Sequence, residues 1–254
     1  MTRSRKSALT VGVLFVITLV AAIPAALLYG PVVDNPLYIV GPGSDSRVLL
    51  GGVFEIITIF ANIATAIVLF PILRRQSEAG SIAYVGARLV EATLMVVGLL
   101  ALLTVVTLRQ DGPVADSGSL LIAGQSLVAL NRWTFLLGPG FVAGIGNGLI
   151  LGYLMYQSAL VPRRLALFGI IGGPLLAASG IAVMLGFIER GSTAQGVATI
   201  LEVIWEIGIM GLYLIFVGFR RPAVEALGLD SVADAALPTS STAPVAVTAK
   251  AGAA

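Results

Sequence analysis

Six long apolar segments, each of membrane-spanning length, dominate this sequence of 254 residues. Roughly 20 apolar residues suffice for an α-helix to cross the hydrocarbon core of a bilayer. Because lipid offers the backbone no hydrogen-bond partner, a spanning segment must be a helix or part of a closed barrel, and unbroken runs of this length are helical. The sequence therefore predicts an all-α, polytopic transmembrane bundle with six spans, at residues 8–28, 51–73, 82–108, 133–153, 165–188 and 197–219.

Composition agrees with residence in a membrane and excludes several kinds of chemistry. Hydrophobic residues make up 57% of the chain and charged residues 11%, against roughly 25% charged in soluble domains. The net charge of +2 indicates no nucleic-acid partner. There is no cysteine and no histidine, which removes disulfides, thiolate nucleophiles, His-based catalytic pairs and the usual zinc and haem ligands. We expect no cofactor and no metal.

The distribution of lysine and arginine indicates the orientation. With six spans, nine basic residues fall at one face of the membrane, and the opposite face has four, diluted by acidic residues. The positive-inside rule then places both termini in the cytoplasm, with the spans in the cell membrane. The first apolar segment exceeds the core of a signal peptide and is expected to be an uncleaved span. The nine residues are Arg3, Arg5, Lys6, Arg74, Arg75, Arg163, Arg164, Arg220 and Arg221.

Beyond the spans, the chain divides into a transmembrane domain over residues 1–221 and a tail over 222–254. The tail is rich in Ala, Thr and Ser and is expected to be disordered and cytoplasmic, after one short helix. Two longer outer loops are predicted from their turn-forming residues, among them Pro31, Pro36, Pro42 and Pro113.

Five ionisable residues lie inside the apolar segments. Each costs at least ~2.5–3.5 kcal/mol at the centre of a membrane helix unless it is paired or hydrated. Two of them are three residues apart on the third span and two are four residues apart on the sixth, so each pair shares a helix face. The residues are Glu55, Arg88, Glu91, Glu202 and Glu206.

At 1.5 Å rise per residue, Glu91 and Glu206 both lie near the bilayer midplane, with Arg88 one turn nearer the cytoplasm. We therefore expect Arg88 to reach Glu91, Glu206 or both, with the third and sixth spans facing each other. Two interpretations remain open. The charges lock the bundle together, or they form a mid-membrane polar cavity that binds protons. Four acids face one base, so Arg88 can pair with only part of the group. This ratio favours the proton-binding interpretation, because an unmatched carboxylate is driven to exchange protons.

Other polar residues in the spans fit structural roles. Asn62 and Asn147 are expected to form interhelical hydrogen bonds, worth roughly 0.6–2 kcal/mol each. Trp205, beside Glu206, is expected to pack in the core, and Trp133 to lie at the membrane interface.

A stripe of glycines predicts close helix packing. Gly140, Gly144, Gly148 and Gly152 repeat every fourth residue on the fourth span, a pattern that lets helix backbones approach. The partner is either the fifth span, with Gly169, Gly173 and Ala177 at the same spacing, or a second protomer in a homo-oligomer. Pro139 and Pro174 predict bends in these two spans.

Short motifs in a fixed order resemble a bacterial integral-membrane family catalogued as domain of unknown function 4386. The resemblance implies a six-helix membrane protein and no particular activity. Glu202 and the tail have no counterpart in its pattern. The matching residues are Leu50–Glu55, Phe70-Pro71-Ile72-Leu73-Arg74, Gly86-x-Arg88-x-x-Glu91, Leu137-Gly138-Pro139, Leu160-Val161-Pro162-Arg163, and Glu206 with the apolar run to Gly218-Phe219.

Three function classes remain open. The first is a small proton- or cation-coupled transporter of a small molecule or ion, using Glu91 and Glu206. The second is a non-transporting accessory, sensory or structural membrane protein in which the charges hold the helices together. The third, a lipid-active enzyme using carboxylates alone, is the least expected, so the chain is predicted not to be an enzyme. The lipid bilayer is its one certain partner.

Overall fold

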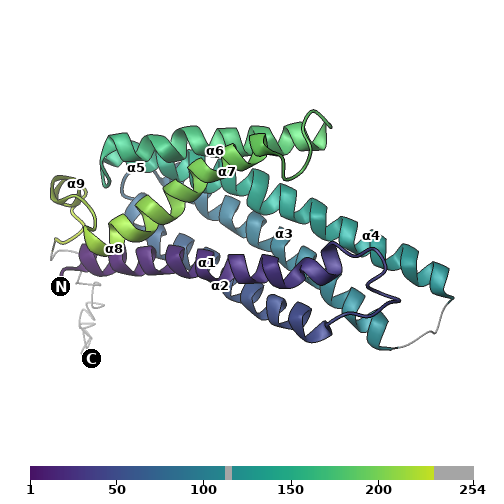
Figure 1. Ribbon diagram of the computed structural model, residues 1–254. Helices are drawn as coiled ribbons and strands as arrows, with labels where there is room; N and C mark the ends of the chain where they lie inside the picture. Colours follow the sequence, from purple (N-terminus) through teal and green to yellow (C-terminus); the bar gives the residue numbers. More distant parts are fainter. Residues whose placement is uncertain (112–115, 232–254) are drawn as a thin grey trace, which may run out of the picture.

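The six predicted spans are confirmed. The computed structural model describes residues 1–111 and 116–231, and within these ranges every regular element is a helix. Six helices are long and apolar enough to cross a membrane, and they lie side by side (Figure 1). The first three spans are α1 (Arg3–Val33), α2 (Asp45–Leu73) and α3 (Glu78–Gln110).

The remaining spans are less regular. The fourth runs continuously from Ser117 to Ser158 and the fifth is α6 (Arg163–Met184). Parts of the fourth and sixth spans are π-helical. Their backbone hydrogen bonds join residues five apart, whereas those of an α-helix join residues four apart. The fourth consists of α4 (Ser117–Phe135), η1 (Leu136–Val142), η2 (Gly144–Leu151) and α5 (Gly152–Ser158); the sixth of α7 (Thr193–Val203), η3 (Ile204–Tyr213) and α8 (Leu214–Phe216).

Several helices extend past their apolar runs. The fourth span begins at Ser117 instead of the predicted residue 133, because Asp116 caps it by accepting a hydrogen bond from the Ser119 N–H at 2.8 Å. Pro31, expected in a loop, lies inside α1. Hydropathy marks where lipid begins, and a capped helix continues beyond that point. The expected sixth span ended at residue 219, but the helix stops at Phe216, before Gly218 with its φ of +84°.

The short helix expected at the start of the tail is α9 (Arg221–Ala226). It is followed by a turn that returns to the N-terminus, where Asp230 accepts hydrogen bonds from the Ser4 backbone N–H at 2.8 Å and from its hydroxyl at 2.7 Å. Residues 222–231 are therefore folded, as the short helix α9 and the turn after it. The rest of the predicted tail, residues 232–254, lies outside the described residues.

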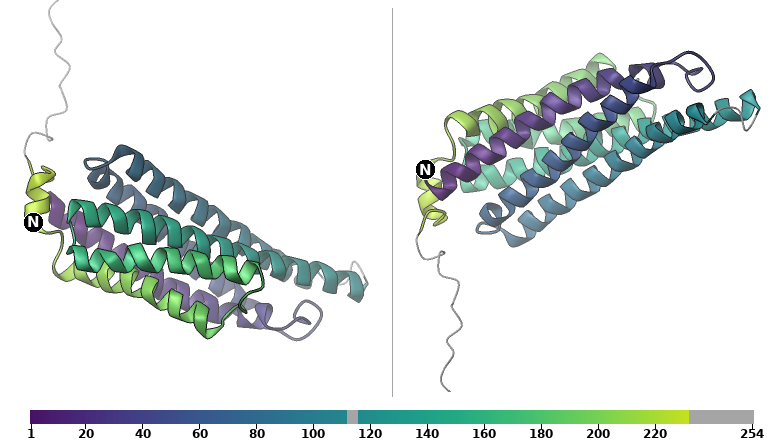
Figure 2. Two further views of the ribbon diagram at one scale, coloured as in Figure 1. Left: turned by 90° about the horizontal axis from the view of Figure 1, so that it is seen from above. Right: turned by 90° about the horizontal axis from the view of Figure 1, so that it is seen from below.

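The six spans form a closed ring in chain order. Each span packs on the next, and α1 closes the ring by packing on η3 and α8 of the sixth span. Gly12 of α1 allows this closure, since a Cβ there would lie 2.7 Å from the carbonyl oxygen of Gly211. In Figure 2 the N-terminus and α9 lie at the same end of the bundle. The third and sixth spans consequently stand at opposite positions of the ring.

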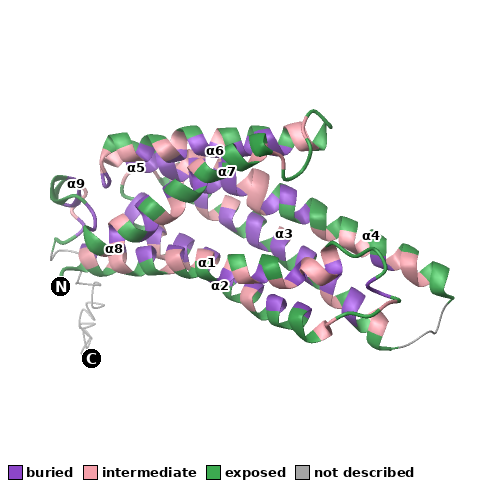
Figure 3. Cartoon of the chain, in the orientation of Figure 1, coloured by how far each residue is buried: buried purple, intermediate pink, exposed green. Residues whose placement is uncertain are grey.

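The outer surface of the ring is apolar. Large hydrophobic side chains such as Leu27, Phe60, Leu100 and Phe216 are exposed, and the exposed residues face outward along every span (Figure 3). A soluble monomer rarely exposes so much contiguous apolar area. This surface contacts the lipid bilayer.

Two apolar clusters fill the ring, one in each half of its length. We name the two halves of the bundle by their distance from the N-terminus, inner for the nearer half and outer for the farther half. The inner cluster includes Leu69, Tyr84 and Trp205, and the outer cluster includes Ile59 and Met95. Along α2 and α3, the residues between these clusters are polar and buried: Asn62, Thr65, Arg88 and Glu91. The middle of the bundle is thus a polar layer between two apolar ones.

Candidate functional site: a polar layer inside the bundle

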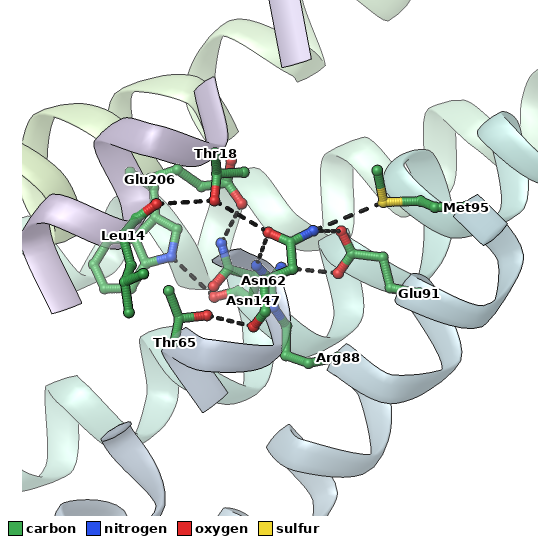
Figure 4. Close-up of polar contacts among 10 residues, drawn as sticks. Leu14, Thr18, Asn62, Thr65, Arg88, Glu91, Met95, Asn147 and Glu206 are labelled. Carbon is green, nitrogen blue, oxygen red and sulfur yellow. Dashed lines mark hydrogen bonds and ion pairs between the residues drawn. The ribbon is translucent and has the colours of Figure 1, made fainter. Parts of the chain in front are cut away.

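Arg88, Glu91 and Asn62 form a closed triad in the polar layer (Figure 4). The Arg88 guanidinium donates to Glu91 Oε2 at 2.8 Å and to Asn62 Oδ1 at 2.6 Å. The Asn62 amide completes the triangle by donating to Glu91 Oε1 at 3.1 Å. Arg88 is 1% exposed and Glu91 4% exposed, so the charges neutralise each other away from water. Each member bonds to the other two, which compensates the buried ion pair, and the Arg88 Nε is the one guanidinium nitrogen left without a hydrogen-bond partner within the described residues.

The spacing in α3 makes the ion pair possible. Residues three apart lie on one helix face, and this face of α3 is directed at α2, where Asn62 lies. Thr18 of α1 also donates to Asn62 Oδ1, at 3.3 Å, and the Asn62 amide contacts the Met95 sulfur at 3.8 Å. The triad therefore joins the first three spans through one asparagine. Asn62 thus forms the interhelical hydrogen bonds expected from the sequence. Nothing in the sequence pointed to Thr18.

A second polar group joins the fourth and sixth spans. The Asn147 side-chain amide of η2 donates to Glu206 of η3, and the Trp205 indole N–H donates to the Asn147 backbone oxygen at 2.9 Å. Trp205 is 0% exposed, in agreement with the core position expected for it. Both partners lie in π-helical segments. Segments of this kind are rare and occur often at functional sites.

Glu202 is the one member of the layer without a hydrogen bond. Both of its carboxyl oxygens are buried and neither has a hydrogen-bond partner within the described residues. Asn147 lies beside it, but the Asn147 amide donates to Glu206. Glu202 precedes Glu206 by one helical turn on the same face, and Arg88 is close enough to interact electrostatically with both. The layer thus holds three carboxyl groups and one guanidinium, and the guanidinium donates to Glu91 alone among the three.

Glu55 lies apart from the other four ionisable residues. It accepts a hydrogen bond from the Tyr29 hydroxyl and lines a cavity of about 510 Å³ in the outer half of the bundle. The five residues singled out from the sequence therefore occupy two places. Arg88, Glu91, Glu202 and Glu206 belong to the polar layer, and Glu55 belongs to the cavity. Nothing in the sequence marks Tyr29 as a partner of Glu55, because a tyrosine near the end of a spanning helix is an ordinary interface residue.

The glycine stripe packs on the fifth span within the same chain. A Cβ at Gly144 would lie 2.5 Å from the Gly173 carbonyl oxygen, and one at Gly152 would lie 2.9 Å from the Ile170 backbone nitrogen. A Cβ at Gly148 would overlap Gly173 and lie 2.7 Å from Glu202 Oε2. Gly140 differs, since only atoms of its own span lie within 4 Å. The stripe therefore also shapes the space in which Glu202 lies.

The proline-containing helices are not interrupted. Pro139 lies inside η1 and Pro174 inside α6, and each helix continues past its proline. Across the part of the chain that the structure describes, no group of three or more acidic residues is arranged to hold a metal ion.

A ring of six spanning helices with an apolar exterior and a buried polar layer defines a polytopic helical membrane protein. The family model for the domain of unknown function DUF4386 matches residues 10–218. The chain belongs to this family, as the motifs in its sequence indicated. Comparisons with curated proteins and with solved structures give no match.

Proposed function

We propose that this protein is a small proton- or cation-coupled transporter in which Glu202 and Glu206 bind the coupling ion. The observation that carries the proposal is Glu202, whose two buried oxygens have no hydrogen-bond partner. A carboxylate in an apolar interior is costly unless it takes up a proton or a cation. Proton-coupled transporters use intramembrane acids in this way.

The surroundings of Glu202 support the same proposal. Glu206 lies one turn from Glu202, and Asn147 is next to both acids. The charge on one acid therefore affects the other. The backbone of η2 and η3 departs from α-helical geometry at this point, and such departures give a helix two nearby arrangements to move between. The closed triad of Arg88, Glu91 and Asn62 would then be the fixed part of the layer.

The alternative is a non-transporting accessory, sensory or structural protein. The closed triad favours it, because hydrogen-bonded polar networks hold helices in register. In that case Glu202 stays permanently neutral. We further propose that both termini are cytoplasmic, in a bacterial plasma membrane, and that the layer binds without catalysing a reaction, since its described side chains are carboxyl groups, amides, hydroxyls and one guanidinium.

Trp205 offers a direct test. The chain has two tryptophans, so Trp133→Phe leaves Trp205, next to the polar layer, as the single reporter. We expect its fluorescence to change when the pH of the purified protein is taken from about 5 to about 9, as a carboxyl group beside it changes charge. The change should disappear in Glu202→Gln and Glu206→Gln and persist in the matched control Glu55→Gln.

Transport itself is tested with the same variants. Proteoliposomes on a supported membrane are exposed to pools of small organic cations and anions at different pH values on the two sides. A transient current that depends on the pH difference and is absent in Glu206→Gln supports coupling. A Trp205 signal that is flat with pH in the parent protein overturns the proposal and leaves the structural alternative.

A further inference from the structure

The cavity that Glu55 lines is separate from the polar layer and has its own chemistry. Its walls come from α1, α2, α3, α4 and the turn between α6 and α7. Its lining on α1 runs from Ala22 to Asp34, which at 1.5 Å rise per residue corresponds to a length of ~18 Å. A volume of about 510 Å³ is within the range of ligand sites. The cavity is therefore long, and large enough for a molecule with an extended body.

The cavity lies where the ring of helices opens toward lipid. α1 packs on η3 and α8 in the inner half of the bundle. In the outer half, α7 runs along α6 and away from α1, as Figure 1 shows. Ala26 and Phe135, which line the cavity, are both exposed on the outside of the bundle. A chain from the bilayer can thus enter sideways between α1 and the rest of the ring.

The body of the cavity is apolar and its outer end is basic. Alanines 22, 25 and 26 of α1 form one wall, and Met95 lies on the α3 side. At the outer end, Arg132 donates to the Val33 backbone oxygen at 2.6 Å and Arg190 donates to the Arg132 backbone oxygen at 2.6 Å. These two bonds hold both side chains at the same end of the cavity, which both arginines line.

The two arginines lack a matching negative charge. Neither forms an ion pair with a carboxylate of the described chain, although Asp34 also lines this end of the cavity. Burial and, as the smaller cause, repulsion by Arg132 lower the pKa of the Arg190 guanidinium. Arg190 also lies over the Trp133 ring, 6.0 Å from its centroid, a position typical of the headgroup region.

We infer that this cavity binds an anionic amphiphile, with its phosphate or carboxylate head on Arg132 and Arg190 and its acyl chain along the alanine wall of α1. Paired guanidinium groups form strong bidentate hydrogen bonds with such heads. Glu55 and the Tyr29 hydroxyl, part-way down, offer polar atoms to a hydroxyl on the ligand. The inference does not depend on transport, since the site can hold a ligand in a protein that moves none.

Native mass spectrometry of the full chain tests the inference with defined probes. Phosphatidylglycerol supplies an anionic membrane lipid, phosphatidylcholine a zwitterionic one with the same chains, and dodecyl phosphate a soluble anion. We expect phosphatidylglycerol or dodecyl phosphate to bind at least ~10-fold more tightly than phosphatidylcholine, and this preference to be lost in Arg132→Gln/Arg190→Gln. Binding of phosphatidylglycerol alone identifies a lipid ligand, and binding of both anions identifies the headgroup as the feature recognised.

Matched variants make the result decisive. Arg47→Gln removes one positive charge from an exposed site at the same end of the bundle and should change nothing, whereas Arg132→Lys/Arg190→Lys should retain much of the preference. Ala25→Phe fills the cavity without changing its charge and should weaken anion binding by a similar ~10-fold. Equal affinity for phosphatidylcholine, or unchanged binding in both the Arg-to-Gln and the Ala25→Phe proteins, would overturn the inference.

Discussion

Arg88 is the most deeply buried charged residue of the described chain, at 1% exposed. Its guanidinium donates to Glu91 and to Asn62, and the two acceptors are also bonded to each other. A buried charge of this kind is stable only when it is paired, because removing one partner leaves the other charge uncompensated in an apolar interior. The triad is thus a unit whose members cannot be changed singly without a large penalty.

This coupling gives a prediction at the level of single residues. Arg88→Met should destabilise the protein by ~3–5 kcal/mol, since it leaves Glu91 buried without its counter-charge. Arg88→Met/Glu91→Met should be closer to the parent protein, because the pair is removed together. Thermal unfolding in detergent measures both, and a double variant less stable than the single one would contradict the triad.

Among the elements, the fourth and fifth spans make the closest contact. Their approach depends on missing side chains, since a Cβ at Gly144, Gly148 or Gly152 would meet the backbone of α6. Without a hydrophobic force between helices in lipid, van der Waals contact of this kind holds them together. Gly140 has the same spacing and no such contact, so it provides an internal control.

We expect Gly148→Ala to destabilise the protein by ~1–3 kcal/mol or more through overpacking against Gly173 and Glu202. Gly140→Ala should be neutral or slightly stabilising, because alanine is the better helix former and nothing beyond its own span is within reach. The comparison is made by thermal unfolding in one detergent. Similar losses in both variants would mean that the contact with α6 does not decide the effect.

The two ends of the described part of the chain meet through one side chain, Asp230. Burial raises the pKa of the Asp230 carboxyl, but the hydrogen bonds from the backbone and hydroxyl of Ser4 outweigh it and hold this pKa below its usual value. The carboxylate also lies at the N-terminus of α1, where the helix dipole favours negative charge. Asp230 therefore acts as a cap supplied by a distant part of the sequence.

This cap predicts a pH dependence of known sign. A carboxyl whose folded pKa is depressed stabilises the protein above its unfolded pKa, about 3.9, and loses that contribution as the pH falls through the folded value. Asp230→Asn should lower stability by about 1 kcal/mol or less at neutral pH, since the site is partly open to solvent. The difference from the parent protein should vanish in acid, and a difference that persists there would contradict the cap.

For the molecule as a whole, the closed ring brings both ends of the described chain to one face. Six spans require this, and the contact of Ser4 with Asp230 is consistent with it. The absence of cysteine from the sequence makes the orientation easy to test, because any introduced thiol is unique.

Single cysteines at Ser119 and Ser231 should react from opposite sides of the membrane. A membrane-impermeant maleimide applied to intact cells should label Ser119→Cys, and Ser231→Cys should react only after permeabilisation, as the bias of lysine and arginine predicts. Labelling of both from the same side would contradict the topology.

The sequence by itself determined the number of spans, the presence of buried charges and the close packing of glycines. These follow from local rules: long apolar runs must be helices in lipid, charges in them must be compensated, and small residues at four-residue spacing let helices approach. The ion pair of Arg88 and Glu91 could be expected for the same reason, since three residues separate them on one helix.

Only the tertiary structure decided which residues from different spans meet. Asn62 closes the triad, Asn147 donates to Glu206, and Glu55 joins Tyr29 at a cavity instead of the polar layer. Helix rotation and the order of the spans around the ring set these pairings. Both depend on the packing of all six helices at once, which no stretch of sequence specifies.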